Sequence, residues 1–82
     1  MKEGKGPKVK LKLGVTTWRE AGEAAGRVYE HLALEGPKNF AELVRGLKTR
    51  EGLILMALGW LSREDKVEFG EDGRVYLKEH SN

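Results

Sequence analysis

The side chains that most often do chemistry in proteins are few in this chain, and their spacing forms no catalytic arrangement. It has no cysteine and two histidines, His31 and His80. His31 directly follows Glu30, and neighbours in a helix do not share a face, so this pair lacks the spacing of metal ligands. No base is arranged beside Ser62 or Ser81. We therefore expect a protein that is not an enzyme and has no metal, cofactor or small-molecule ligand.

Basic side chains offer the remaining chemistry, which is contact with phosphate. Residues 1–12 hold five lysines and one glutamate, a net charge of +4. The other seventy residues hold ten basic and twelve acidic side chains, a net charge of −2. A high isoelectric point often indicates nucleic-acid binding. Here that interpretation can apply only to the N-terminal arm or to a local patch.

The length of 82 residues predicts one small domain with one thin core. A chain of this size hides only about 60% of the surface that its unfolded form exposes. No apolar run approaches the roughly 20 residues of a membrane span. No apolar signal segment follows the basic start. We expect a cytoplasmic protein without membrane association.

The N-terminal region divides into a tail and a segment of alternating residues. Residues 1–7 have no apolar periodicity and read as a disordered tail. Residues 8–13 alternate strictly, with the period of a strand. The apolar side holds Val9, Leu11 and Leu13, and the other side holds Lys8, Lys10 and Lys12. Two interpretations stay open: an edge strand whose lysines prevent aggregation, or a basic arm that lies along phosphates.

The first predicted helix has clear ends and a narrow apolar stripe. Thr17 and Glu20 have the spacing of a capping box, and Gly36-Pro37 is a stop signal. The stripe is formed by Trp18, Ala21, Ala25, Val28 and Leu32.

Two glycines interrupt this helix, at positions 22 and 26. Each costs about 1 kcal/mol relative to alanine. We interpret them as permitting close approach of another element within the monomer, and the alternative is a tight helix pair in a dimer.

Two further helices follow in quick succession. Asn39 and Glu42 repeat the capping-box spacing, and Phe40, Leu43, Val44 and Leu47 form the apolar set of a short helix. Thr49 is a candidate N-cap for a third helix over about residues 50–63. Two helices joined by so tight a turn are typical of a helix-turn-helix.

A hairpin completes the domain. Val67 and Phe69 alternate with charged residues, Asp72-Gly73 is a strong hairpin signal, and residues 74–78 form the return strand. Residues 79–82 are a polar tail. The order predicts a winged helix-turn-helix domain over residues 8–78: a mainly α fold with a small β-sheet (α+β), three helices followed by a β-hairpin wing, to which residues 8–13 could add a strand.

Two segments also resemble a known family. Residues 21–29, Ala-Gly-Glu-Ala-Ala-Gly-Arg-Val-Tyr, resemble the first-helix signature of small stand-alone winged helix-turn-helix proteins of bacteria and archaea. Residues 56–64, Met-Ala-Leu-Gly-Trp-Leu-Ser-Arg-Glu, followed by Lys66-Val67, resemble that family's third helix and wing. The resemblance covers about residues 15–78 and implies a winged-helix fold, DNA binding inferred from that fold, and dimers in some members. It does not extend to the lysine-rich segment.

The third helix offers little for reading bases. A helical projection gives it an apolar arc of about 200°. The remaining face has no asparagine, glutamine or central arginine, the residues that best recognise base edges. The wing tip, Glu71-Asp72, is unfavourable beside phosphates. The candidate DNA contacts are Arg45, Lys48, Thr49, Arg50, Arg63, Arg74, Lys8, Lys10 and Lys12.

Two functions follow from these observations. The first is a DNA-associated, regulator-like module with weak sequence readout. The second is a protein-interaction or homodimerisation module that has kept the fold without binding DNA. The candidate core or interface residues are Trp18, Gly22, Gly26, Leu55, Gly59 and Trp60. Trp60 in particular is expected to be buried, so that its replacement by alanine would cost about 3–5 kcal/mol.

Overall fold

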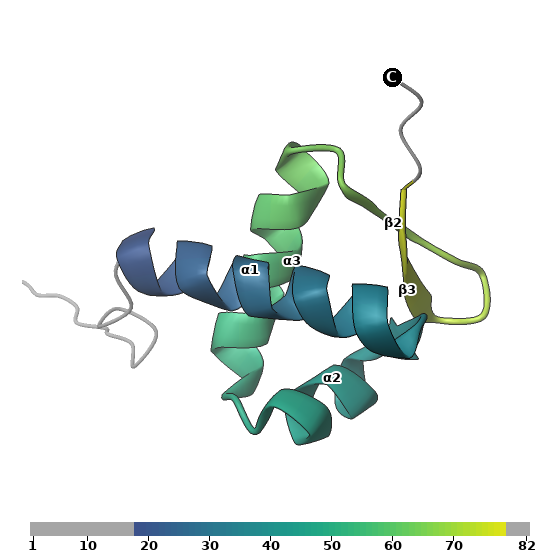
Figure 1. Ribbon diagram of the computed structural model, residues 1–82, viewed down its shortest axis with the longest axis horizontal. Helices are drawn as coiled ribbons and strands as arrows, with labels where there is room; N and C mark the ends of the chain where they lie inside the picture. Colours follow the sequence, from purple (N-terminus) through teal and green to yellow (C-terminus); the bar gives the residue numbers. More distant parts are fainter. Residues whose placement is uncertain (1–17, 79–82) are drawn as a thin grey trace, which may run out of the picture.

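The computed structural model describes residues 18–78 and confirms three helices followed by a hairpin. The elements are α1 (Trp18–Glu35), β1 (Lys38–Asn39), α2 (Phe40–Leu47), α3 (Glu51–Arg63), β2 (Val67–Phe69) and β3 (Arg74–Leu77). Figure 1 shows α1 crossing in front of α3, with α2 beneath the crossing and the strands to one side. This is an α+β winged helix.

Helix α1 ends where the sequence predicts. Gly36 adopts a positive φ of 91°, and its N–H donates to the Leu32 carbonyl at 2.9 Å. Thr17, the predicted cap, lies outside the described residues. The buried face consists of Ala21, Ala24, Ala25, Val28 and Leu32. Trp18 belongs to the sequence stripe but is 79% exposed, because the buried part of the helix begins only at Ala21.

Helix α2 has the predicted capping box. The Asn39 side chain accepts from the Glu42 N–H at 2.8 Å, and Glu42 Oε1 accepts from the Asn39 N–H at 2.9 Å. The helix ends at Leu47, and its C-cap, Lys48, lies in the left-handed region with φ 53°.

The sequence predicted Thr49 as the N-cap of α3, and this prediction is wrong. The N-cap is Arg50, and no side-chain hydrogen bond caps the helix. The Thr49 hydroxyl instead donates to the Leu47 carbonyl at 2.9 Å. The threonine therefore stabilises the turn that precedes α3 rather than the first turn of α3.

The sheet contains a strand that the sequence did not reveal. The strand order of the sheet is β1-β3-β2, with both pairings antiparallel, and the unexpected strand is β1. In β1, Lys38 pairs with Val75 and Asn39 with Arg74. A two-residue strand is too short for any alternation, and its existence depends on β3. Because β1 joins α1 to α2, it fixes the wing beside the start of α2.

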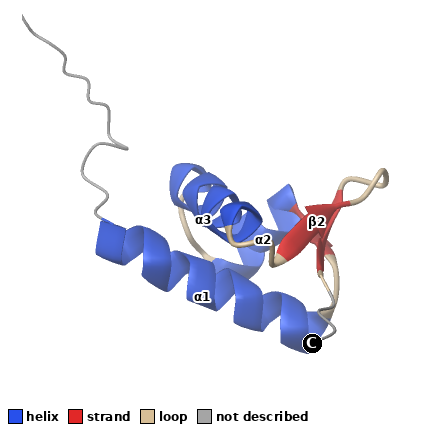
Figure 2. Ribbon diagram, turned by 90° about the horizontal axis from the view of Figure 1, so that it is seen from above, coloured by secondary structure: helices blue, strands red, loops and turns tan. Residues whose placement is uncertain are grey.

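The core lies where the three helices and the sheet meet, as seen from above in Figure 2. Val28, Leu43 and Ile54 are the largest fully buried side chains, one from each helix. Val67 and Val75 close the core from the sheet side. No described residue with a polar or charged side chain is buried. Helix α3 is thus the central element, and only part of its surface reaches solvent.

Candidate functional site

The turn between α2 and α3 gathers basic side chains. Arg45 lies in the last turn of α2, Lys48 is its C-cap, and Arg50 is the N-cap of α3. All three are exposed. The N-terminal end of a helix also carries a partial positive charge. These three side chains and the helix end favour an anion such as a phosphate, whereas exposed Glu51 in the first turn of α3 opposes it.

Arg27 on α1 holds this turn in place, a role that sequence reasoning missed. Its Nη2 donates to the Thr49 hydroxyl oxygen at 2.5 Å and to the Leu47 carbonyl at 3.3 Å. Thr49 is half-buried, and its hydroxyl both accepts from Arg27 and donates within the turn. Among the candidate DNA contacts, Thr49 is therefore already engaged inside the protein.

Replacing Arg27 with methionine should loosen the turn. Methionine keeps most of the apolar stem but cannot donate to Thr49 or Leu47. We expect the free energy of unfolding to fall by about 0.5–1 kcal/mol, because exposed hydrogen bonds contribute modestly. Urea unfolding measures this loss. Arg19→Met is the control, since Arg19 is an exposed arginine on the same helix. Equal losses in both variants would contradict the role of Arg27.

The start of the wing lies close to α2. Arg74 is opposite Asn39 in the sheet register. The hydrogen bond from the Asn39 backbone lowers the pKa of Glu42, partly opposed by desolvation, and the positive charges of Lys38, Arg74 and Arg45 lower it further. Arg74 and Arg45 thus act on the same carboxylate. Arg74 lies at the start of α2, at the other end of this helix from the turn, and Glu42 reduces the positive potential beside it.

The wing tip is a compact acidic turn. The Tyr76 hydroxyl donates to Asp72 Oδ2 at 2.6 Å, and the Arg74 N–H donates to Oδ1 at 3.0 Å. The Tyr76 hydrogen bond, followed by that of the Arg74 backbone, lowers the pKa of Asp72. Asp72 therefore stays charged to a lower pH than an ordinary aspartate. With exposed Glu71 beside it, the tip disfavours contact with a phosphate backbone.

The outward face of α3 is poor in polar groups. The buried set is Ile54, Ala57, Leu58 and Leu61. The exposed set includes Glu51, Leu55, Gly59 and Ser62, and Leu55 is 58% exposed. A helix that reads base pairs usually presents arginine or amide side chains on this face. This face can supply shape and apolar contact but little hydrogen bonding.

The remaining candidate contacts lie elsewhere. Arg63 is in the last turn of α3, about 18 Å along the helix from its start at a rise of 1.5 Å per residue. Lys8, Lys10 and Lys12 fall outside the described residues. The structure therefore groups Arg45, Lys48, Thr49 and Arg50 at the turn, and it places Arg74 at the start of α2 and Arg63 at the end of α3.

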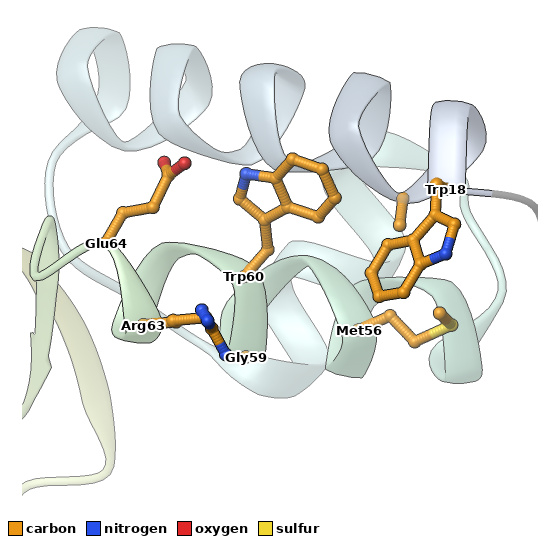
Figure 3. Close-up of a pocket in the computed structure, with 7 residues that line it drawn as sticks. Trp18, Met56, Gly59, Trp60, Arg63 and Glu64 are labelled. Atoms are coloured by element: carbon orange, nitrogen blue, oxygen red, sulfur yellow. The ribbon is translucent and has the colours of Figure 1, made fainter.

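An apolar groove lies between α1 and α3, away from the basic turn. Its volume is about 640 Å³, and its lining is Trp18, Ala21, Met56, Gly59, Trp60, Arg63 and Glu64. Figure 3 shows the two indoles side by side between the helices. Their ring centroids are 6.0 Å apart with an interplanar angle of 57°. Both tryptophans of the chain thus line one surface feature.

The sequence predicted that Trp60 is buried, but in the structure it is only half-buried. Its ring lies over Gly22, where a Cβ atom would be 3.3 Å from Cη2, whereas a Cβ at Gly26 would have no neighbour within 4 Å. Trp60 also lines the groove. Close approach between α1 and α3 thus occurs at Gly22 and not at Gly26.

Comparison with known proteins agrees with this architecture. Residues 16–79 match the family model described as "Winged helix-turn-helix domain (DUF2582)". The chain belongs to this family. A relative from Methanocaldococcus jannaschii, "Uncharacterized protein MJ1608", is 36% identical over 64 residues, which cover 73% of this chain and 89% of the relative. No solved structure gives a significant match.

In this winged helix-turn-helix domain, the described residues form neither a cluster of metal ligands nor a membrane-spanning helix. Within residues 18–78, no three histidine, cysteine, aspartate or glutamate side chains come together as a metal site. No helix in that range has the length and apolar character needed to cross a membrane. The basic turn and the apolar groove are surface features of the described residues.

Proposed function

We propose that this domain binds duplex DNA through the basic turn between α2 and α3, with weak dependence on sequence. The observation that carries the proposal is the grouping of exposed Arg45, Lys48 and Arg50 at the N-terminal end of α3. In a helix-turn-helix, that end of the second helix approaches the major groove. Lysine and arginine contacts to phosphates supply most of the non-specific affinity for DNA.

Weak sequence readout follows from the outward face of α3. Leu55 and Gly59 are exposed there, and neither can donate to or accept from a base edge. Phosphate contacts set position and orientation but carry no base information. The domain would therefore act as a regulator-like DNA-associated module. Arg74 and the N-terminal lysines would add affinity that does not depend on sequence.

A charge-removing triple variant tests this proposal. It carries Arg45→Gln, Lys48→Asn and Arg50→Gln, with asparagine chosen because it tolerates the left-handed conformation of Lys48. Fluorescence anisotropy of a labelled duplex is measured over a salt series. We expect weaker binding, and a log–log salt slope that is flatter by up to about 0.9 for each lost phosphate contact. The loss should be alike for unrelated DNA sequences.

The matched control removes three positive charges from residues outside the turn. It carries Arg19→Gln, Lys66→Gln and Lys78→Gln, none of which is a candidate DNA contact. Its net charge equals that of the first variant, so long-range attraction changes equally. A slope that falls by the same amount in both variants would show that DNA does not contact the turn. A wild-type chain that binds no duplex at low salt would remove the proposal altogether.

The alternative function is self-association. The observation that favours it is exposed apolar surface: Leu55 on α3 is 58% exposed and Phe69 on β2 is 59% exposed. A homodimer would bury such residues at a two-fold interface. Light scattering distinguishes the two functions, because a self-association module gives a dimer mass without DNA.

A further inference from the structure

We propose that residues 8–13 fold back onto their own domain and cover the groove between α1 and α3. The apolar side of this segment, Val9, Leu11 and Leu13, would face the groove, and its lysines would face water. This inference concerns a surface distinct from the proposed DNA site and does not depend on that function.

The groove needs an apolar occupant. Trp18 is 79% exposed, and Met56 and Trp60 are only half-buried. Five of the seven lining residues carry no charge, and the two charged ones, Arg63 and Glu64, are of opposite sign. Burying apolar surface gains about 25 cal/mol for each Å² removed from water. The two charges of the lining cancel, so the groove does not need a charged occupant. A segment with an uncharged, apolar inner side therefore suits it.

The position of the tether favours this segment. The described chain begins at Trp18, which is itself part of the groove lining. Leu13 is five residues upstream, so it cannot lie farther than about 18 Å from Trp18. Five residues from Val9 to Leu13 span about 13 Å when extended. The groove runs along α3 from Met56 to Arg63, about 10 Å. The segment can therefore both reach the groove and match its length.

The size of the groove favours a tethered segment over a second copy of the chain. Among residues 18–78, seven line it, whereas a standard protein interface uses about 20–30 residues on each side. A short tether keeps the segment at an effective concentration in the millimolar range. A weak apolar contact that would not hold two molecules together can thus be occupied within one molecule.

Cysteine cross-linking tests the proposal, because the chain has no cysteine of its own. The test pair is Leu11→Cys with Gly59→Cys. Gly59 lines the groove, and an added Cβ there has no neighbour within 4 Å. The control pair is Leu11→Cys with Gly26→Cys, which also has space for a Cβ but lies outside the groove lining. A second control, Lys12→Cys with Gly59→Cys, moves the thiol to the opposite side of the segment.

On addition of copper phenanthroline as oxidant, we expect the test pair to form an intramolecular disulfide, measured as the loss of both free thiols in a protein that stays monomeric on a non-reducing gel. It should form at least about tenfold faster than in either control, because docking raises the effective concentration of the two thiols. Equal rates in all three pairs would overturn the proposal. A disulfide-linked dimer as the main product would also overturn it and identify a second copy as the occupant.

Intrinsic fluorescence gives an independent readout, since both tryptophans line the groove. In the full chain, Leu11→Gln should shift the emission to longer wavelength and increase acrylamide quenching. Lys12→Gln should leave both quantities unchanged, because its side chain would point to water. Spectra that respond equally to the two substitutions, or to neither, would contradict docking of the apolar side.

Discussion

Replacing Ile54 with alanine should destabilise the domain by about 2–5 kcal/mol, the range for a large-to-small change in a core. Ile54 is 0% exposed, and it belongs to the cluster that joins α1, α2, α3 and the sheet. A small domain has about 5–15 kcal/mol of stability in total. We therefore expect a large fall in the urea midpoint measured by circular dichroism. The slope of the transition should stay close to that of the wild type.

The neighbouring residue provides the control. Leu55 is 58% exposed, so Leu55→Ala removes little buried surface and should change stability by at most about 0.5 kcal/mol, as is usual for surface substitutions. The two substitutions remove similar groups from adjacent positions of one helix. Comparable losses would show that α3 is rotated relative to the core.

Trp60→Ala should be less damaging than Ile54→Ala, the reverse of the order that residue size suggests. The sequence predicted a buried indole and a loss of about 3–5 kcal/mol. In the structure Trp60 is half-buried and lines the groove, so truncation leaves a wider groove rather than an enclosed cavity. The prediction and the structure differ because sequence periodicity shows which face of a helix is apolar. It does not show whether another element covers each residue of that face.

Elements with strong local signals could be predicted from the sequence. The Asn39–Glu42 capping box fixed the start of α2, and Gly36 ended α1. Asp72-Gly73 marked the wing turn, where Gly73 has a positive φ of 83°. In each case the residues that determine the conformation lie within a few positions of one another.

Features that depend on distant partners could not be predicted. Strand β1 exists only through its pairing with β3. Arg27 reaches Leu47 and Thr49 across 20 and 22 residues, and this contact makes Thr49 part of the turn. Of the candidate DNA contacts, those within Arg45–Arg50 came together because they are close in sequence. Arg63 separated from them because a straight helix carries it to the other end of α3.

Replacing either of two glycines of α1 with leucine should change the stability of the domain in opposite directions. Gly22→Leu should destabilise the domain, and Gly26→Leu should stabilise it. At Gly22 a Cβ would already lie 3.3 Å from Trp60 Cη2 and 3.4 Å from Cζ2. The further carbons of leucine must displace the indole, and overpacking of this kind costs about 1–3 kcal/mol. At Gly26 the space is open, so only the helix propensity changes, a gain of about 0.5–1 kcal/mol.

Thermal melts of the two variants, combined with light scattering, measure this difference. The propensity gain is common to both positions, so the gap between the two melting temperatures reports the contact of Gly22 with Trp60. Tryptophan emission should change in Gly22→Leu and stay constant in Gly26→Leu. Stabilisation by both substitutions would show that the indole does not lie over Gly22. A loss of dimer mass on Gly26→Leu would instead place Gly26 in an interface between two copies, since nothing within the monomer opposes a side chain there.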